Sequence, residues 1–185
     1  MNLLDMDGAQ RQRVGIAARS CAIGTVLGAF YPLHWLIGIL GFMLVAIRAR
    51  QLRDLPGFDW VQWFASLCAI GALVSRALSG IWLISWLLAM VLPALQLLLI
   101  DRLRRAFGRM CPDGNRAGLC ALCAAILCTA LAVASNLLVL GALGGMQWKI
   151  YMAAQAISFG LGVLAALLLA VCLLLKLRKS KEDIE

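Results

Sequence analysis

The carboxylates of this chain are the first residues to examine for chemistry, because paired acids carry out proton transfer, hydrolysis and metal-assisted catalysis. An acid inside a membrane helix is the usual proton or cation relay of pumps and transporters. All nine acidic residues lie in predicted loops, tails or helix ends: Asp5, Asp7, Asp54, Asp59, Asp101, Asp113, Glu182, Asp183 and Glu185. We therefore expect neither a proton-coupled antiporter nor an enzyme.

His34 is the one histidine of the chain, which excludes haem ligation by two histidines and a two-histidine metal site within one chain. Tyrosine and tryptophan prefer the membrane–water interface, and both occur beside it. We therefore predict that Tyr31, His34 and Trp35 lie together at an outer turn. His34 is then an interfacial polar residue, and a pH-sensitive role beside Tyr31 is the alternative.

Cys120 and Cys123 form a C-x-x-C pattern, whose two cysteines share one face of a helix. Met110 and Cys111 lie close to them in the sequence, and thiolates with a thioether are soft ligands that suit Cu(I). The chain has no second pair of this kind, and buried cysteine usually behaves as a small hydrophobic residue. We therefore predict neither a metal nor a cofactor and keep these four residues as weak metal candidates.

The amide side chains that we single out deep inside apolar runs are Asn136, Gln155 and Gln96. Asn136 and Gln155 lie at similar distances from the connection predicted between the last two helices, so antiparallel packing would set them at similar depth. A hydrogen bond between them would hold those helices together. The alternative is that all three amides line a pore or a substrate cavity, with arginines at its inner mouth favouring anions.

Pairs of small residues at positions i and i+4 permit two helices to approach closely. The candidate packing residues are Gly24 with Gly28, Ala156 with Gly160, and Ser158 with Gly162. The pattern is compatible with contacts inside one chain and with contacts between chains.

These residues must be positioned in a lipid bilayer, because the composition is not that of a soluble globule. The chain has 185 residues, of which 63% are hydrophobic and 14% charged, and its mean hydropathy is +0.92. Soluble domains have about 45–50% apolar and about 25% charged residues. The net charge of +8 comes from basic residues at the ends of apolar runs, as expected for topology signals and contacts with anionic lipids rather than nucleic acid.

The run 58–100 contains one charge beyond Asp59 at its start, namely Arg76, and is long enough for two crossings of a hydrocarbon core about 30 Å thick. We predict a helical hairpin there, with its turn around Arg76 and with Pro93 kinking the second helix. A loop over 101–116 follows. The runs 117–143 and 150–175 form another hairpin, over 117–175.

The run 14–47 has two interpretations, one long kinked span or a short hairpin that folds at Tyr31 and Pro32. The hairpin is favoured because it places the aromatic cluster outside and all nearby arginines inside. Its legs are short for a bilayer, so they require local thinning or a re-entrant hairpin shielded by other helices.

The predicted fold is all-α: a polytopic integral membrane protein of five or six transmembrane helices, arranged as successive hairpins with short loops. One membrane domain covers 1–185, with a polar segment over 1–13 and a charged tail over 176–185. Residues 1–19 contain no apolar core before a cleavage site, so we expect no cleaved signal peptide. Basic loops flank the 58–100 hairpin and mark the cytoplasmic side, which puts the C-terminus in the cytoplasm of a bacterial inner membrane.

The absence of a catalytic group favours a non-enzymatic membrane subunit or interaction protein, which acts by helix packing with other membrane chains or with itself. One alternative is a homo-oligomeric channel or passive transporter. Another is a membrane immunity or stress-protection protein. The expected partners are the lipid bilayer, anionic headgroups at the cytoplasmic face and other membrane chains, but not nucleic acid.

Overall fold

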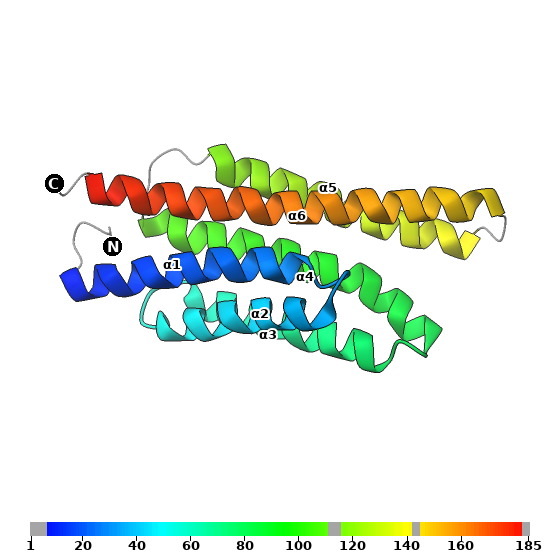
Figure 1. Ribbon diagram of the computed structural model, residues 1–185, viewed down its shortest axis with the longest axis horizontal. Helices are drawn as coiled ribbons and strands as arrows, with labels where there is room; N and C mark the ends of the chain where they lie inside the picture. The colour runs from blue at the N-terminus through cyan, green and yellow to red at the C-terminus, as the bar shows by residue number, and fades with distance from the viewer. Residues whose placement is uncertain (1–6, 111–115, 142–144, 183–185) are drawn as a thin grey trace.

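The chain forms a bundle of antiparallel helices (Figure 1). The computed structural model describes residues 7–110, 116–141 and 145–182. Over these residues it contains six helices: α1 Gly8–Ala29, α2 Trp35–Gln51, α3 Phe58–Ala77, α4 Trp82–Met110, α5 Arg116–Gly141 and α6 Gly145–Glu182. The same residues form no strand, so the all-α prediction is confirmed for them.

The helices close into a ring in chain order. Each helix packs against its neighbours in the chain, and α6 returns to pack against α1. Because successive helices alternate in direction, α1 begins and α6 ends at the same end of the bundle (Figure 1). We name this the basic end, and the end with the α3–α4 turn the opposite end. Arginines of the basic end are Arg11, Arg13, Arg19, Arg48, Arg50, Arg53, Arg102, Arg104, Arg105 and Arg109.

Helix length and composition identify an integral membrane protein. Four of the described helices are long and apolar enough to cross a bilayer, over Phe58–Ala77, Leu83–Arg109, Gly118–Leu137 and Lys149–Leu175. These segments belong to α3, α4, α5 and α6. The five or six crossings predicted from the sequence also count α1 and α2, and this finer count stays a prediction.

Helix α4 does not end where its apolar run ends. The sequence predicted a loop from Asp101 onward, but the helix continues to Met110. Asp101 accepts hydrogen bonds from Arg104 and Arg105, one turn further along the same helix. Pairs at i+3 and i+4 stabilise a helix that has left the apolar layer, which explains the difference.

Helices α1 and α2 fold back on each other through a tight turn. The amide nitrogens of Leu33 and His34 both donate to the carbonyl of Phe30, each at 3.0 Å. Along the legs, Gly24 faces Gly41, and a Cβ added at Gly41 would lie 2.6 Å from the carbonyl oxygen of Gly24. The glycine pair of α1 therefore makes its close contact inside the chain, with α2.

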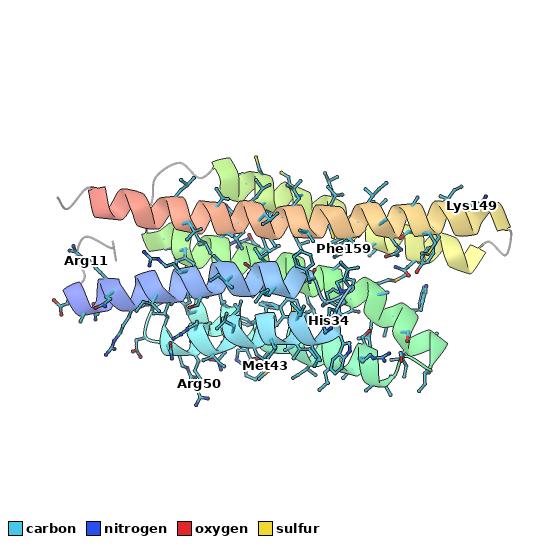
Figure 2. All side chains as sticks on the ribbon, viewed as in Figure 1. Arg11, His34, Met43, Arg50, Lys149 and Phe159 are labelled. Carbon is cyan, nitrogen blue, oxygen red and sulfur yellow. The ribbon has the colours of Figure 1, made fainter. Side chains whose placement is uncertain are left out.

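The α1–α2 hairpin ends well short of the opposite end. Phe30 meets Phe159 of α6 edge to face, with ring centroids 6.1 Å apart. Phe159 follows Ile150 by about nine residues, which is about 14 Å of helix. His34 and Phe159 accordingly lie near the middle of the molecule's length, between Arg50 and Arg11 at one end and Lys149 at the other (Figure 2).

The hydrophobic core fills the basic half of the bundle, where all six helices are present. Its buried members include Val14, Cys21, Val45, Phe58, Val61, Leu103, Phe107, Ala121, Leu169 and Leu173. Phe58 and Phe107 pack edge to face with centroids 5.1 Å apart. The cluster begins at Leu99 on α4 and at Ala165 on α6, so it stops near the tip of the α1–α2 hairpin.

Candidate functional site

A cavity of about 270 Å³ lies where the α1–α2 hairpin ends. Tyr31 and Pro32 of the turn line it, together with residues of α3, α4, α5 and α6. Its polar lining consists of Tyr31, Ser75, Gln96, Cys128, Gln155 and Ser158. Among the described residues none with a charged side chain lines it, so the cavity offers hydrogen bonds without a fixed charge.

Helix α4 contributes one wall through the turn around Pro93. Proline has no N–H, so the carbonyl of Ala89 loses its partner within the helix. Ala89 and Pro93 both line the cavity. The Pro93 carbonyl accepts a hydrogen bond from Thr129 Oγ1 of α5 at 3.2 Å, and the same hydroxyl donates to Ala125 at 2.9 Å. This bond fixes α4 against α5 at the level of the cavity.

Gln96 joins α4 to the tip of the α1–α2 hairpin. Its Nε2 donates to the carbonyl oxygen of Gly28 at 3.5 Å, a long contact that is easily broken. Gln96 also lines a second void of about 20 Å³, with Thr25, Phe42 and Leu99. It therefore stands between the main cavity and the packed basic half.

Gln155 reaches across from α6 to α5. Its Nε2 donates to Ser135 Oγ at 2.9 Å, and Ser135 Oγ donates to the carbonyl of Ala132 at 3.0 Å. Asn136, which is 1% exposed, donates from Nδ2 to the same carbonyl at 2.7 Å. The amide of Gln155 thus pairs with Ser135 where the sequence favoured Asn136, and Asn136 stays outside the lining of the cavity.

Ser158 and Cys128 form a second link between α5 and α6. Ser158 Oγ donates to the Cys128 carbonyl at 3.0 Å, and a Cβ added at Gly162 would lie 3.3 Å from Cys128 Sγ. The Ser158–Gly162 pair therefore packs inside the chain. Ala156 and Gly160 are exposed on α6, and a Cβ at Gly160 would meet nothing within 4 Å.

The residues of the predicted outer turn separate in the structure. Tyr31 is partly buried and lines the cavity, whereas His34 and Trp35 are exposed. Because the turn lies beside Phe159, His34 sits near the middle of the bundle's length (Figure 2).

Of the four sulfur-containing residues considered as metal ligands, the structure describes the side chains of two. Cys120 and Cys123 are both exposed on α5. Cys111 and the side chain of Met110 lie outside the described residues. Within the described part of the chain, no three His, Cys, Asp or Glu side chains group as metal ligands.

The sequence identified Gln96 and Gln155 as polar candidates and Ser158 as a packing residue, but it did not identify Ser75 and Cys128. The spacing of Gln155, Ser158 and Gly162 could have indicated that these residues lie together. They occur at i, i+3 and i+7 and so share one face of α6. Tyr31 was identified, but as a surface residue of an outer turn and not as the floor of a cavity.

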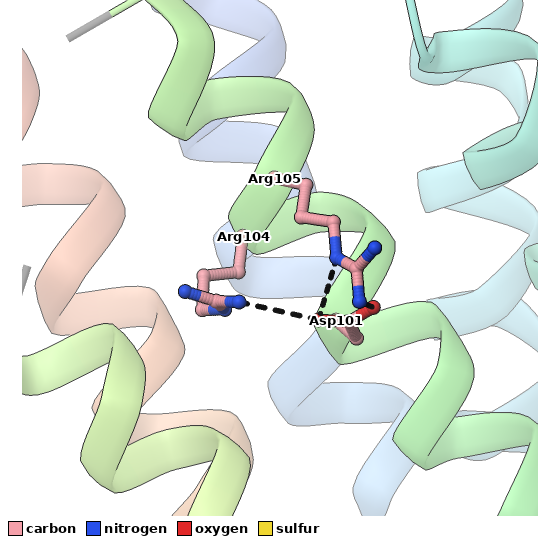
Figure 3. A network of polar contacts seen from close by, with 3 residues as sticks. All are labelled: Asp101, Arg104 and Arg105. Carbon is pink, nitrogen blue, oxygen red and sulfur yellow. Dashed lines mark hydrogen bonds and ion pairs between the residues drawn. The ribbon is translucent and has the colours of Figure 1, made fainter. Parts of the chain in front are cut away.

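The basic end is organised by ion pairs around a single acid. Asp101 pairs with Arg105 at 2.7 Å and with Arg104 at 3.4 Å (Figure 3). Its side chain is largely buried, and the same helix supplies both guanidinium groups. Arg53 and Asp59 form a separate, exposed pair at 2.9 Å beside the start of α3.

The fold and the cavity together define a helical integral membrane protein with an uncharged polar site between its helices. No protein-family model, curated protein or solved structure matches the chain.

Proposed function

We propose that this protein is a passive transporter that binds a small uncharged polar solute in the cavity beyond the α1–α2 hairpin. The observation that carries the proposal is the cavity itself, which lies between membrane-type helices and combines amide, hydroxyl and phenol groups without a charge. Buried polar groups in an apolar surrounding are costly unless they have partners, so they mark functional sites in membrane proteins. A solute would form hydrogen bonds there in addition to those that Gln96, Gln155 and Ser158 make within the chain.

The hairpin tip is the element that we expect to move during transport. It is held to α4 by the long Gln96–Gly28 hydrogen bond, while its two legs pack closely on each other, with Val45 against Gly24 and Phe42 against Gly28. The hairpin would therefore move as one unit. The smaller void on the far side of Gln96 continues the path toward the basic half. Displacement of the tip would join the two spaces, as in the gating of one element against a rigid frame.

The distribution of arginines supports an orientation with the basic end in the cytoplasm, because positive residues accumulate on that side of short loops. We accordingly propose a bacterial inner-membrane protein with a cytoplasmic C-terminus and a cavity on the outer side of the hairpin. A tag after Glu185 should be protected from protease in whole cells. Cleavage of that tag from outside would reverse the orientation.

A flux measurement in proteoliposomes tests the proposed function. Swelling rates in glycerol and in urea should exceed those of protein-free liposomes, and Gln155→Leu should lower them about threefold or more by removing a hydrogen-bonding group from the cavity. Gln62→Leu is the matched control, since this amide of α3 does not line the cavity. No flux above that of protein-free liposomes would refute transport, and equal flux in all three proteins would refute a path through the cavity.

A non-enzymatic role as a membrane subunit is the second proposal. The observation that favours it is the exposed position of Ala156 and Gly160 on α6, since a small-residue face permits close approach of another membrane helix. This role would be favoured over transport if the folded protein shows no flux and if Gly160→Leu weakens its self-association.

A further inference from the structure

A stacked arrangement of three side chains lies on the α3–α4 surface at the basic end. The guanidinium carbon of Arg102 is 5.5 Å from the ring centroid of Trp60. Trp60 in turn stacks on Phe64, with centroids 6.2 Å apart and planes at 28°. Trp60 is 56% exposed, so one edge of this stack is open to the surroundings. An arginine held over an aromatic face keeps a fixed orientation.

Arg102 shares with Arg48 and Arg104 a buried Nε atom that has no hydrogen-bond partner in the described part of the chain. It differs from these two arginines because Arg104 also pairs with Asp101 and Arg48 with Gln51, whereas Arg102 forms no ion pair with the described residues. The nearby carboxylates are already engaged. Asp101 pairs with Arg104 and Arg105 (Figure 3), and Asp59 pairs with Arg53. A buried charged donor that lacks an acceptor is costly. The Arg102 guanidinium therefore has donor capacity that the described residues leave unused.

The position of this arginine along α4 indicates what would supply the acceptor. Arg102 lies two residues after Ile100, where the apolar run ends, and exposed Trp60 and Trp63 lie near the start of α3. Tryptophans of this kind mark the level of lipid headgroups. A phosphate at that level offers negative charge and several acceptor oxygens, which match a planar guanidinium. Arg109, two turns further along α4, adds positive charge beside Gly57.

We propose that Arg102 and Trp60 form a binding site for the phosphate group of an anionic phospholipid in the leaflet at the basic end. The guanidinium donates to the phosphate oxygens while its face rests on the indole ring. The site lies on the outside of the bundle and is separate from the cavity, so it does not depend on the proposed transport. The sequence predicts contacts with anionic headgroups in general, and this site assigns one such contact to Arg102 and Trp60.

Native mass spectrometry of the full chain, purified in a neutral detergent, tests this proposal. The protein is titrated with phosphatidylglycerol and, separately, with phosphatidylcholine. We expect phosphatidylglycerol to bind more tightly, and Arg102→Gln to weaken it about fivefold, which corresponds to about 1 kcal/mol. Arg102→Lys should also weaken binding, because lysine keeps the charge but loses the planar fork.

Two further variants make the result decisive. Arg50→Gln removes the same charge from an exposed position of α2 and should bind phosphatidylglycerol as the unchanged protein does. Trp60→Leu, at an exposed position that the fold tolerates, should weaken binding as Arg102→Gln does. Equal loss in Arg50→Gln and Arg102→Gln would show diffuse charge attraction and overturn the site. So would equal affinity for the two lipids, or displacement of the lipid by millimolar inorganic phosphate.

Discussion

The two halves of this bundle are built from similar apolar helices, yet one half has a closely packed core and the other contains a cavity. In the basic half all six helices meet, and Cys21, Val45, Phe58 and Leu103 are fully buried. Beyond the tip of the α1–α2 hairpin only four helices continue, and a cavity of about 270 Å³ lies between them. Composition alone does not produce this difference, which follows from the length of one hairpin.

The polar residues follow the same division. Gln96, Gln155 and Ser158 occur at or beyond the tip of the hairpin, at positions that line the cavity. Among the residues that the structure describes, the buried polar or charged ones of the packed half are Thr25, which bonds to its own helix, and Asp101, which is paired with arginines. The comparison teaches that a short hairpin can create a polar site inside an otherwise closed bundle.

The strongest way to break this comparison is to separate the legs of the hairpin. A leucine at Gly41 would place side-chain atoms against the backbone of Gly24, where even a Cβ lies at 2.6 Å. We expect Gly41→Leu to destabilise the protein by about 3 kcal/mol or more, because the neighbouring atoms are backbone and cannot move aside. Thermal unfolding in detergent measures this.

The matched control is Gly160→Leu on the exposed face of α6, where a Cβ has nothing within 4 Å. Its unfolding midpoint in a monomeric preparation should stay close to that of the unchanged protein. Equal destabilisation by the two substitutions would mean that the glycine contact does not hold the hairpin.

A smaller effect should distinguish the two halves directly. Leu103→Ala removes a fully buried side chain from the packed half, and we expect a loss of about 2–5 kcal/mol. Leu92 is almost as buried but borders the cavity, so its side chain has fewer neighbours to lose. Leu92→Ala should therefore lower the free energy of unfolding by less than Leu103→Ala does, with a difference of about 1 kcal/mol or more. Chemical unfolding of both variants in one detergent compares them, and equal losses would contradict a hollow half.

Much of the fold could be predicted from the sequence, because it depends on local signals. The turn at Tyr31 and Pro32 and the start of α3 after Pro56 and Gly57 follow from turn residues between apolar runs. The membrane character follows from the length of those runs. The end of α4 was predicted too early. The ion pairs of Asp101 with Arg104 and Arg105 stabilise the helix beyond the apolar run, and the prediction did not consider them.

The cavity could not be predicted, because it depends on how far one hairpin reaches along its neighbours. That reach is set by contacts between distant parts of the chain, such as Phe30 with Phe159 and Gln96 with Gly28. The choice of Ser135 over Asn136 as the partner of Gln155 has the same origin. Adjacent residues point about 100° apart on a helix, so a small rotation decides which one faces α6.

The depth of the hairpin tip is the central claim, and intramolecular thiol cross-linking in native membranes tests it most directly. Phe30→Cys is combined with either Phe159→Cys or Lys149→Cys, and a short thiol-specific cross-linker is followed by mass spectrometry of the linked peptides. Because the rings of Phe30 and Phe159 lie 6.1 Å apart, we predict efficient linkage of the first pair and none of the second. Linkage of residue 30 to residue 149 but not to residue 159 would place the turn at the membrane surface and contradict the account.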